Sequence, residues 1–529
     1  MAAASTPDSL DTVAERPAVN RWLIAISVMA GTFMVVLDTT VVNVSLPHIA
    51  GSLSATPDEA TWALTSYLTA NAVILPMTGW LANFFGRKRL LMAAVGGFTI
   101  ASSLCGLAPT LGILVVFRVI QGLTGGVMQP LSQAVLLEAF PPHERGKAMG
   151  FWGLGIVVAP IIGPVLGGWL TADYSWRWIF YINIPVGIVA LVLMQIFIFD
   201  PHYIRRATAR IDYWGIGLLA VGFGALQIAL DKGQEEDWLS SHLIVGLLVV
   251  AAVGLVWMVV HELRTRSPIV DLRVFKNRTY TSGVLLMSLT GFVLYGSLVL
   301  LPLMLQTLMG YPPLEAGIAL APRGMGSFIA MPLVGVIMSR VDPRKLLVSG
   351  VVLAAFTLFW FSWLNLDAGY WDLFWPQFIQ GIALGLLFVP LTTITMDPIS
   401  NAQMGNATSL YNLTRNVGSS MGIALAETLV ARHLQIHTNI LGARINAYDK
   451  APVLMFERLK AAFMASGSDA VTAGHQALAA LAGMVQRQAA LLSYLDAFRW
   501  LGWLVLIILP LVFVMRRPRH KAEGPVVME

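Results

Sequence analysis

The chain is built from long, unbroken apolar runs. We count fourteen runs close to or above the roughly 20 residues that an α-helix needs to cross the hydrocarbon core of a bilayer. They are centred on residues 22–46, 61–82, 90–108, 112–135, 147–170, 178–199, 212–230, 241–260, 280–306, 315–339, 345–364, 372–397, 405–430 and 495–515. Only 12% of the 529 residues are charged and 57% are hydrophobic, whereas soluble domains are about 25% charged. Because the runs are continuous rather than alternating, a transmembrane β-barrel is excluded. The sequence predicts an all-α integral membrane protein with 14 transmembrane helices.

The distribution of basic residues predicts the orientation of these helices. If the N-terminus is cytoplasmic, 22 of the 34 Lys and Arg residues fall in inside segments, and two, Arg177 and Lys232, fall in short outside loops. This asymmetry is the positive-inside rule, from which the long segment 431–494 is exempt because long segments translocate regardless of charge. We therefore expect both termini in the cytoplasm and a retained first helix. The net charge of +5 reflects this topology rather than a nucleic-acid partner.

An internal repeat divides the chain into two related halves. Gly79 and the basic residues that follow it recur at Gly335 and Arg344-Lys345, at an offset of 256 residues, and Ile120-Gln121-Gly122 recurs as Ile379-Gln380-Gly381 at an offset of 259. Parallel repeats around a central path are an architecture of secondary transporters. We expect two six-helix pseudo-repeat bundles separated by two inserted helices. The predicted segments are an N-terminal tail (1–21), a first bundle (22–200), the inserted pair (201–265), a second bundle (266–515) and a C-terminal tail (516–529).

A few ionisable residues lie inside the apolar runs. Asp38 is in the middle of the first run and Arg118 is in the fourth. A charge at the centre of a spanning helix costs about 2.5–3.5 kcal/mol on insertion scales, so it needs a partner or a function. Burial disfavours the charged carboxylate and a nearby Arg favours it, which is the balance that a proton-coupling residue needs. The alternative is a static ion pair. For Arg323 and Arg415, a structural role is the favoured interpretation.

The fifth run carries a stripe of small residues. Gly155, Ala159, Gly163 and Gly167 recur every four residues, and Pro160 and Pro164 lie beside them. Small residues let another helix approach closely, and the prolines are bend points. We expect this helix to form a seal between two moving halves.

Several classes of catalytic motif are absent. The only Gly-Lys pair, Gly146-Lys147, is followed by Ala148 and does not form a nucleotide-binding P-loop. The sequence lacks H-E-x-x-H and G-x-S-x-G, and its one cysteine, Cys105, makes a thiolate metal site implausible. We expect no enzymatic activity, no cofactor and no metal, and energy drawn from an ion gradient.

Together these motifs resemble the fourteen-helix drug:proton antiporter branch of the major facilitator superfamily, of EmrB/QacA type. The resemblance covers all fourteen runs. Its segments are 37–47, 79–91, 118–126, 153–168 and 176–185. It implies a major-facilitator fold, proton coupling by Asp38 and Arg118, and a seal made by the Gly and Pro residues of the fifth run.

The cytoplasmic loop motif of the family departs from its usual pattern at one position. Its residues here are Gly79, Asn83, Gly86, Arg87 and Lys88. The family usually has Asp where this chain has Asn83, so the charge-assisted lock of the outward-facing state should be weaker or made elsewhere.

The resemblance also implies partners and a location. EmrB-like members work in the bacterial inner membrane with a periplasmic adaptor (a membrane fusion protein) and an outer-membrane TolC-like channel. Segment 431–494 could dock such an adaptor or could be a solvated amphipathic loop.

The sequence thus predicts a proton-coupled antiporter that exports lipophilic or amphiphilic compounds by alternating access. The alternatives are a single-metabolite or fatty-acid-like exporter on the same fold, an importer, and a non-transporting receptor or scaffold. Candidate cavity residues are polar or aromatic residues of the central runs, each of which could instead serve helix packing. They are Asn43, Tyr67, Asn71, Gln129, Gln133, Tyr295, Gln306, Tyr411 and Asn412.

Overall fold

The computed structural model describes residues 20–200, 212–265, 268–446 and 448–515. The described chain is helical, and thirteen of its helices are long and apolar enough to cross a membrane. The remaining predicted run, 405–430, lies in α16 (Met404–Ala443), which buries polar residues such as Thr408, Asn412 and Arg415 among its neighbours. Because of this polarity, the mean hydropathy of α16 is below that of the thirteen helices. Helix α16 nevertheless packs within the bundle beside α12 (Arg278–Thr307) and α18 (Ala470–Val514).

The first half of the chain forms one bundle. Its helices are α1 (Arg21–Ser52), the short α2 (Pro57–Ala60), α3 (Trp62–Ile74), α4 (Thr78–Phe85), α5 (Arg87–Leu107), α6 (Leu111–Ala139), α7 (Arg145–Asp173), α8 (Trp178–Tyr181) and α9 (Asn183–Phe197). A single 3₁₀ turn, Leu75–Met77, joins α3 to α4, so these two helices form one crossing. Polar caps start several helices: the Asn20 side chain accepts from the Trp22 N–H at 3.0 Å.

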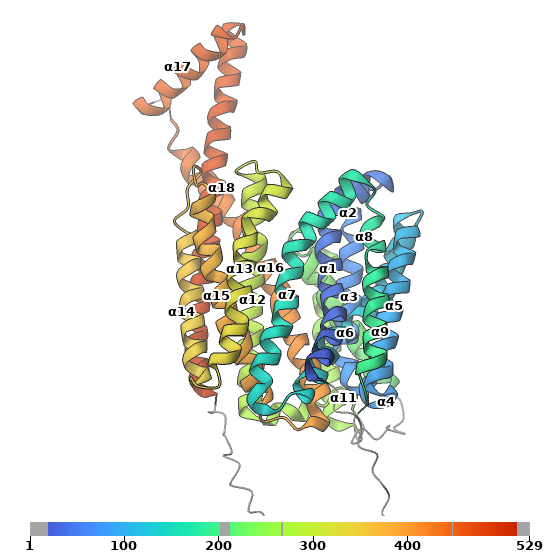
Figure 1. Cartoon of the computed structure of the whole chain (residues 1–529). Helices are drawn as coiled ribbons and strands as arrows, with labels where there is room; N and C mark the ends of the chain where they lie inside the picture. The colour runs from blue at the N-terminus through green and yellow to red at the C-terminus, as the bar shows by residue number, and fades with distance from the viewer. Residues whose placement is uncertain (1–19, 201–211, 266–267, 447, 516–529) are drawn as a thin grey trace, which may run out of the picture.

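The second half forms a matching bundle. Its helices are α12, α13 (Pro313–Ile337), α14 (Pro343–Phe361), α15 (Tyr370–Met396), α16, α17 (Lys450–Ala465) and α18. Figure 1 shows the two bundles side by side, with α7 facing α13 between them. Helix α16 also crosses to the first bundle, where it contacts α4 and α6.

The two inserted helices, α10 (Tyr213–Lys232) and α11 (His242–Arg264), pack on each other and contact both bundles. Asp231 accepts a hydrogen bond from Thr65 of α3. On the other side, Gln227 donates to the Ser420 hydroxyl of α16 at 3.0 Å, and the Trp238 indole N–H donates to Thr428 at 2.9 Å. The inserted pair therefore bridges the two halves along one side.

The repeat seen in the sequence is also a repeat of contacts. Gly79 lies against the backbone of α16, where an added Cβ would come within 2.6 Å of Asn406 Cα. Its counterpart Gly335 lies against α7, where an added Cβ would come within 2.7 Å of the Gly146 carbonyl oxygen. Each half thus uses a matched glycine to bring its second crossing onto the fifth crossing of the other half.

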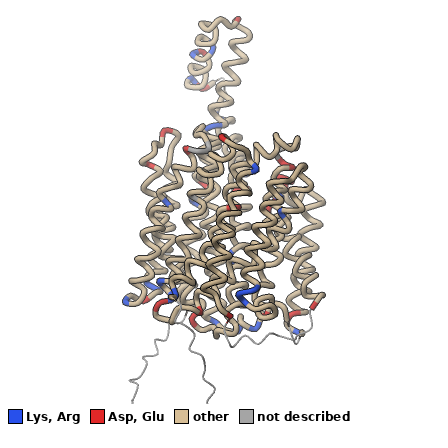
Figure 2. The backbone as a smooth tube through the Cα atoms, turned by 45° about the vertical axis from the view of Figure 1, so that its right-hand side comes forward, with Lys and Arg blue, Asp and Glu red and all other residues tan. Residues whose placement is uncertain are grey.

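One end of the molecule carries a projection. Helices α16 and α18 extend past the other helices, and α17 packs on α18 to complete a helical hairpin at the top of Figure 1. None of the side chains of α17 is buried. We call α17 and the part of α18 that it contacts the projection. Figure 2 shows Lys and Arg concentrated at the opposite end of the bundle, which we call the basic end.

Candidate transport site

An ion pair lies inside the first bundle at the two positions that the sequence singled out. Arg118 Nη1 of α6 is 2.6 Å from Asp38 Oδ2 of α1, and both side chains have 0% exposure. The Arg118 Nε–H also donates to the Ala63 carbonyl of α3 at 2.7 Å. The structure therefore joins three helices at one buried charge pair.

Two neutral residues complete this network. Gln121 donates to Asp38 Oδ1 at 2.9 Å, and Asn183 of α9 donates to the same oxygen at 3.0 Å. Gln121 also accepts from Arg118 Nη1 at 2.7 Å. Neither residue was predicted as a site residue, although both lie in motifs that carry the family resemblance; the available signal was the recurrence of Gln121 as Gln380 in the internal repeat. We call Asp38, Arg118, Gln121 and Asn183 the acid network.

The acid network is buried, but some polar atoms in and beside it have no hydrogen-bond partner among the described residues. The Arg118 guanidinium lies 4.2 Å from the centre of the Tyr67 ring, a cation–π contact that stabilises a desolvated cation. Arg118 Nη2 and the Tyr67 hydroxyl are buried without a hydrogen-bond partner among the described residues. Since an unsatisfied buried donor costs about 1–3 kcal/mol or more, the network holds groups that could take new partners after a rearrangement. Tyr67, predicted as a cavity residue, contacts Arg118 of this network instead.

Hydrogen bonds also link the two halves. Arg415 of α16 donates to Gln129 of α6 at 2.9 Å, and Asn412 donates to Gln133 at 2.6 Å. The indole of Trp152 on α7 stacks on Phe388 of α15 at 5.8 Å. Three of the predicted cavity residues, Gln129, Gln133 and Asn412, therefore act in this structure as bonds between the bundles.

A mostly apolar cavity lies between the bundles, lined by residues of α7, α12, α13, α15 and α16. Leu294, Leu320 and Phe388 contribute apolar wall, and Tyr295 is the one predicted cavity residue that lines it. Arg323 and Arg415 line it as well, although the sequence favoured a packing role for both. Arg323 Nη1 and Arg415 Nε have no hydrogen-bond partner among the described residues.

The other predicted cavity residues lie elsewhere. Asn43 and Gln306 are exposed. Asn71 lies against the backbone of Gly126 within the first bundle, and the Tyr411 hydroxyl is 2.8 Å from the Thr392 hydroxyl within the second. None of these four residues lines the cavity described above, because helix periodicity gives polar positions but not the neighbour each one faces, and their role in binding stays a prediction.

The small-residue stripe of α7 packs within its own bundle. All four members are buried, and an added Cβ at Gly155, Gly163 or Gly167 would meet Met29, Thr40 or Val41 of α1. The stripe therefore faces α1 rather than the other half, which corrects the expected partner of the seal.

The face of α7 that meets the other half carries different glycines. Gly146 and Gly150 lie against the backbone of α13 at Gly335 and Met331. The two prolines do face this interface: Pro160 lines the cavity, and Pro164 lies 3.5 Å from the Cβ position of Gly317.

The loop motif holds the basic end together. Gly86 has a φ of +88°, a backbone conformation that favours glycine. The Lys88 N–H donates to Asp200 Oδ1 at 2.8 Å. Arg87 forms a buried ion pair with Glu138 of α6 and donates to the Asn401 carbonyl of the second bundle at 3.3 Å. The charged contact at this loop is thus made between Arg87 and Glu138.

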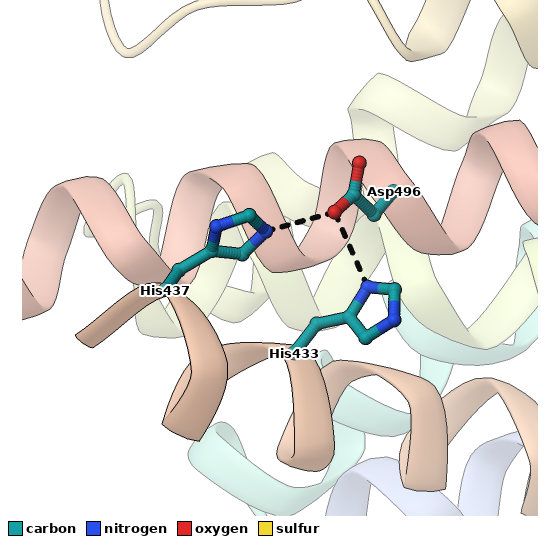
Figure 3. Close-up of side chains that lie close together, drawn as sticks. All are labelled: His433, His437 and Asp496. Carbon is teal, nitrogen blue, oxygen red and sulfur yellow. Dashed lines mark hydrogen bonds and ion pairs between the residues drawn. The ribbon is translucent and has the colours of Figure 1, made fainter. Parts of the chain in front are cut away.

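A separate cluster lies where α16 and α18 approach the projection. His433 and His437 of α16 converge on Asp496 of α18, with Nδ1 and Nε2 at 3.2 and 2.8 Å from Oδ2 (Figure 3). The sequence analysis missed this cluster because 59 residues separate the nearer histidine from the aspartate; the His-x-x-x-His spacing was its available signal.

The fold and these motifs match known proteins. The sequence model of the Major Facilitator Superfamily matches residues 28–423. The chain belongs to this superfamily. It is 38% identical to fatty acid resistance protein FarB of Neisseria gonorrhoeae, over 95% of this chain and 97% of that protein. It is also 38% identical to multidrug export protein EmrB of Escherichia coli K12, over 95% and 96% of the two chains.

Solved major facilitator structures share the architecture. A double tryptophan mutant of XylE has a TM-score of 0.60 at 14% identity, covering 95% of this chain and 97% of that one. The human organic anion transporter MFSD10 has a TM-score of 0.57 at 13% identity, covering 93% and 100%. As a member of the superfamily, the protein is a membrane transporter rather than an enzyme. Its acid network lies within one half, and its cavity lies between the two.

Proposed function

We propose that the protein is a proton-coupled antiporter that exports lipophilic or amphiphilic compounds by alternating access. The observation that carries this proposal is the acid network. Asp38 is a carboxylate inside a membrane transporter. Arg118, Gln121 and Asn183 donate hydrogen bonds to its oxygens at 2.6–3.0 Å. A buried acid is expensive in a membrane helix, and α6, which carries Arg118 and Gln121, also contacts α16 of the other half.

The mechanism follows from the partners of Asp38. The three donors stabilise the carboxylate, so proton uptake requires at least one of them to move away. Arg118 and Gln121 lie on α6, which also carries Gln129 and Gln133, the partners of Arg415 and Asn412. A rocking motion that breaks these bonds between the halves would shift α6 relative to α1 and change the protonation of Asp38. One proton moved inward is worth roughly 2.3 kcal/mol per 100 mV.

We further propose the export direction and the assembly. Relatives named for multidrug export and fatty acid resistance support efflux. In a bacterial inner membrane, with the basic end and both termini on the cytoplasmic side, the projection would extend into the periplasm. There it would contact a periplasmic adaptor that leads to a TolC-like outer-membrane channel.

Inside-out vesicles test this proposal. With a fluorescent pH-gradient probe, addition of lipophilic drugs should dissipate the gradient when the wild-type protein is present. Asp38→Asn should abolish this response while the protein stays folded and inserted. Asp58→Asn, which changes an exposed aspartate, is the matched control and should respond like the wild type. Wild-type rates in Asp38→Asn would remove Asp38 from the mechanism. No response of the wild type to any of several drugs would favour a receptor or scaffold.

A second candidate substrate class is favoured by one specific observation. The cavity is largely apolar, yet Arg323 and Arg415 line it and form no ion pair with a described residue. A lipophilic carboxylic acid would place its tail on the apolar wall and its carboxylate on a guanidinium, an interaction that Arg makes in bidentate form. The relative named for fatty acid resistance fits this chemistry.

Resistance profiles separate the two substrate classes. In cells that lack their own drug pumps, Arg323→Gln and Arg415→Gln should lower protection against a long-chain fatty acid by about tenfold or more. Protection against a lipophilic cation should change little. Equal losses for both compounds would reject a charge-based role for the two arginines.

A further inference from the structure

The side-chain cluster near the projection has the chemistry of a metal site. His433 and His437 are four residues apart on α16 and so lie on one helix face. Asp496 of α18 faces them (Figure 3), and one ligand atom from each of the three residues lies within 4.8 Å of the others. Two histidines at this spacing on a helix, with a carboxylate from another element, are a common ligand set for Zn²⁺.

We propose that His433, His437 and Asp496 bind a divalent transition-metal ion, Zn²⁺ by preference. In a tetrahedral zinc site with bonds of about 2.0–2.2 Å, the ligand atoms are roughly 3.3 Å apart. Asp496 Oδ2 is already 2.8 Å from His437 Nε2 and 3.2 Å from His433 Nδ1. Small side-chain rotations would bring all three atoms onto one ion.

The surroundings leave a coordination position open. The side chains of both histidines are 21% exposed and that of Asp496 is 26% exposed, so a metal ion can enter and a water molecule can supply the fourth ligand. The charged neighbour is Arg499, whose Nη1 is 3.4 Å from the other carboxylate oxygen, Oδ1. It thus orients Asp496 and leaves Oδ2 for the metal. Because the Arg499 side chain is 51% exposed, its repulsion of the ion is screened by solvent.

The position of the site gives the metal a structural consequence. Helix α18 leads directly into the projection, and α16 runs back into the bundle to Arg415 and Asn412 at the interface between the halves. A metal ion bound by both helices would fix the orientation of the projection relative to α16. A bound zinc ion would thus hold α16 and α18 together at the base of the projection. This role does not depend on which compound the protein transports.

Zinc binding to the purified full-length protein tests the proposal. The protein is stripped with a chelator and titrated with Zn²⁺ against a fluorescent zinc indicator. We expect one site per chain, with an affinity lowered at least about tenfold in His433→Ala, His437→Ala and Asp496→Asn. His475→Ala is the matched control because His475 is exposed on the same α18; it should bind like the wild type.

A second readout separates a metal site from a set of hydrogen bonds. Co²⁺ bound by two imidazoles and a carboxylate in tetrahedral geometry gives strong visible absorption, which the His433→Ala/His437→Ala double variant should lack. That variant is checked for a monodisperse gel-filtration peak, so a failure to fold is distinguished from lost binding. A wild type that retains no zinc, or a folded double variant that binds zinc as tightly as the wild type, would overturn the proposal.

Discussion

The two halves of the transporter keep the same packing and differ in charge. Gly122 of the first half lies against the backbone of Tyr67, and its counterpart Gly381 lies against the backbone of Arg323. These partners are themselves related by the 256-residue offset of the repeat. The helix contacts have thus been preserved while the side chains beside them have diverged.

The first half holds a buried ion pair, Asp38–Arg118, whereas the second half has a neutral residue at the counterpart of Arg118. The counterpart of Arg118 at the 259-residue offset is Gln377. In the second half, Gln380 donates to Ser297 at 3.3 Å, whereas its counterpart Gln121 donates to a carboxylate. Within the described part of the chain, Arg323 donates to the Leu294 carbonyl alone, at 3.4 Å. We infer a division of labour in which the first half handles the proton and the second half supplies cations to the cavity.

Replacing Arg118 by Gln, the residue at its counterpart in the second half, should have the largest effect. Arg118→Gln leaves Asp38 buried without its cation, and breaking a buried pair costs about 3–5 kcal/mol. We expect a lower thermal midpoint in detergent and no gradient-driven transport. The double variant Asp38→Asn/Arg118→Gln should recover most of the stability and none of the transport. The matched change Gln377→Leu in the second half should retain both.

Transport by the double variant would contradict this division, because no acid would then remain in the network. Equal destabilisation by Gln377→Leu and Arg118→Gln would show that the two halves do not differ as their side chains indicate.

The paired glutamines give the next largest effect. Gln121→Leu removes a donor to a charged carboxylate, which is worth about 1.5–3 kcal/mol, whereas Gln380→Leu removes a neutral hydrogen bond worth about 1 kcal/mol. Because Gln121 donates to the proposed proton-coupling acid, Gln121→Leu should lower both the thermal midpoint and the rate of drug-dependent pH-gradient loss, whereas Gln380→Leu should lower the midpoint only slightly. Thermal unfolding in detergent and the vesicle assay measure these effects, and equal losses in both variants would reject a special role for the first half.

The matched glycines should instead behave alike. An added methyl at Gly79 or Gly335 meets backbone of the opposite half, which the helices can relieve only by moving apart, at about 1–3 kcal/mol. Gly79→Ala and Gly335→Ala should lower the thermal midpoint by similar amounts. Gly96→Ala, in open space on α5, should leave it unchanged or slightly raised. Thermal unfolding in detergent measures all three, and a loss confined to one half would contradict the pseudo-symmetry of the interface.

The sequence predicts the charged part of the site better than the neutral part. Asp38 and Arg118 could be found because charge is rare and costly in membrane helices. Gln121 and Asn183 could not be separated from other buried amides by composition. The stripe on α7 predicted a close helix contact, but periodicity defines a face and not its partner, so the contact with α1 required the fold.

Contacts between segments far apart in the sequence limit the prediction of other sites in the same way. The histidines of α16 and Asp496 meet only because α18 returns beside α16 after the projection, which no local pattern predicts. Arg323 and Arg415 were assigned to packing because the sequence does not show which helix faces border the cavity. The fourteen runs, in contrast, each correspond to helical structure, since bilayer thickness fixes helix length locally.

The smallest effect is expected at the departure from the family loop motif. Asn83→Asp restores the usual acid, but Arg87 already has a carboxylate partner in Glu138. A further half-buried acid near this partly solvated end should therefore add about 0–1 kcal/mol, which is a change in transport of about fivefold at most. Glu138→Gln should have the larger effect because it removes the existing buried partner. Drug-dependent loss of the pH gradient in vesicles compares the two variants. If Asn83→Asp alters transport more than Glu138→Gln does, then the charged contact at the basic end depends on the position of Asn83 and not on the Arg87–Glu138 pair.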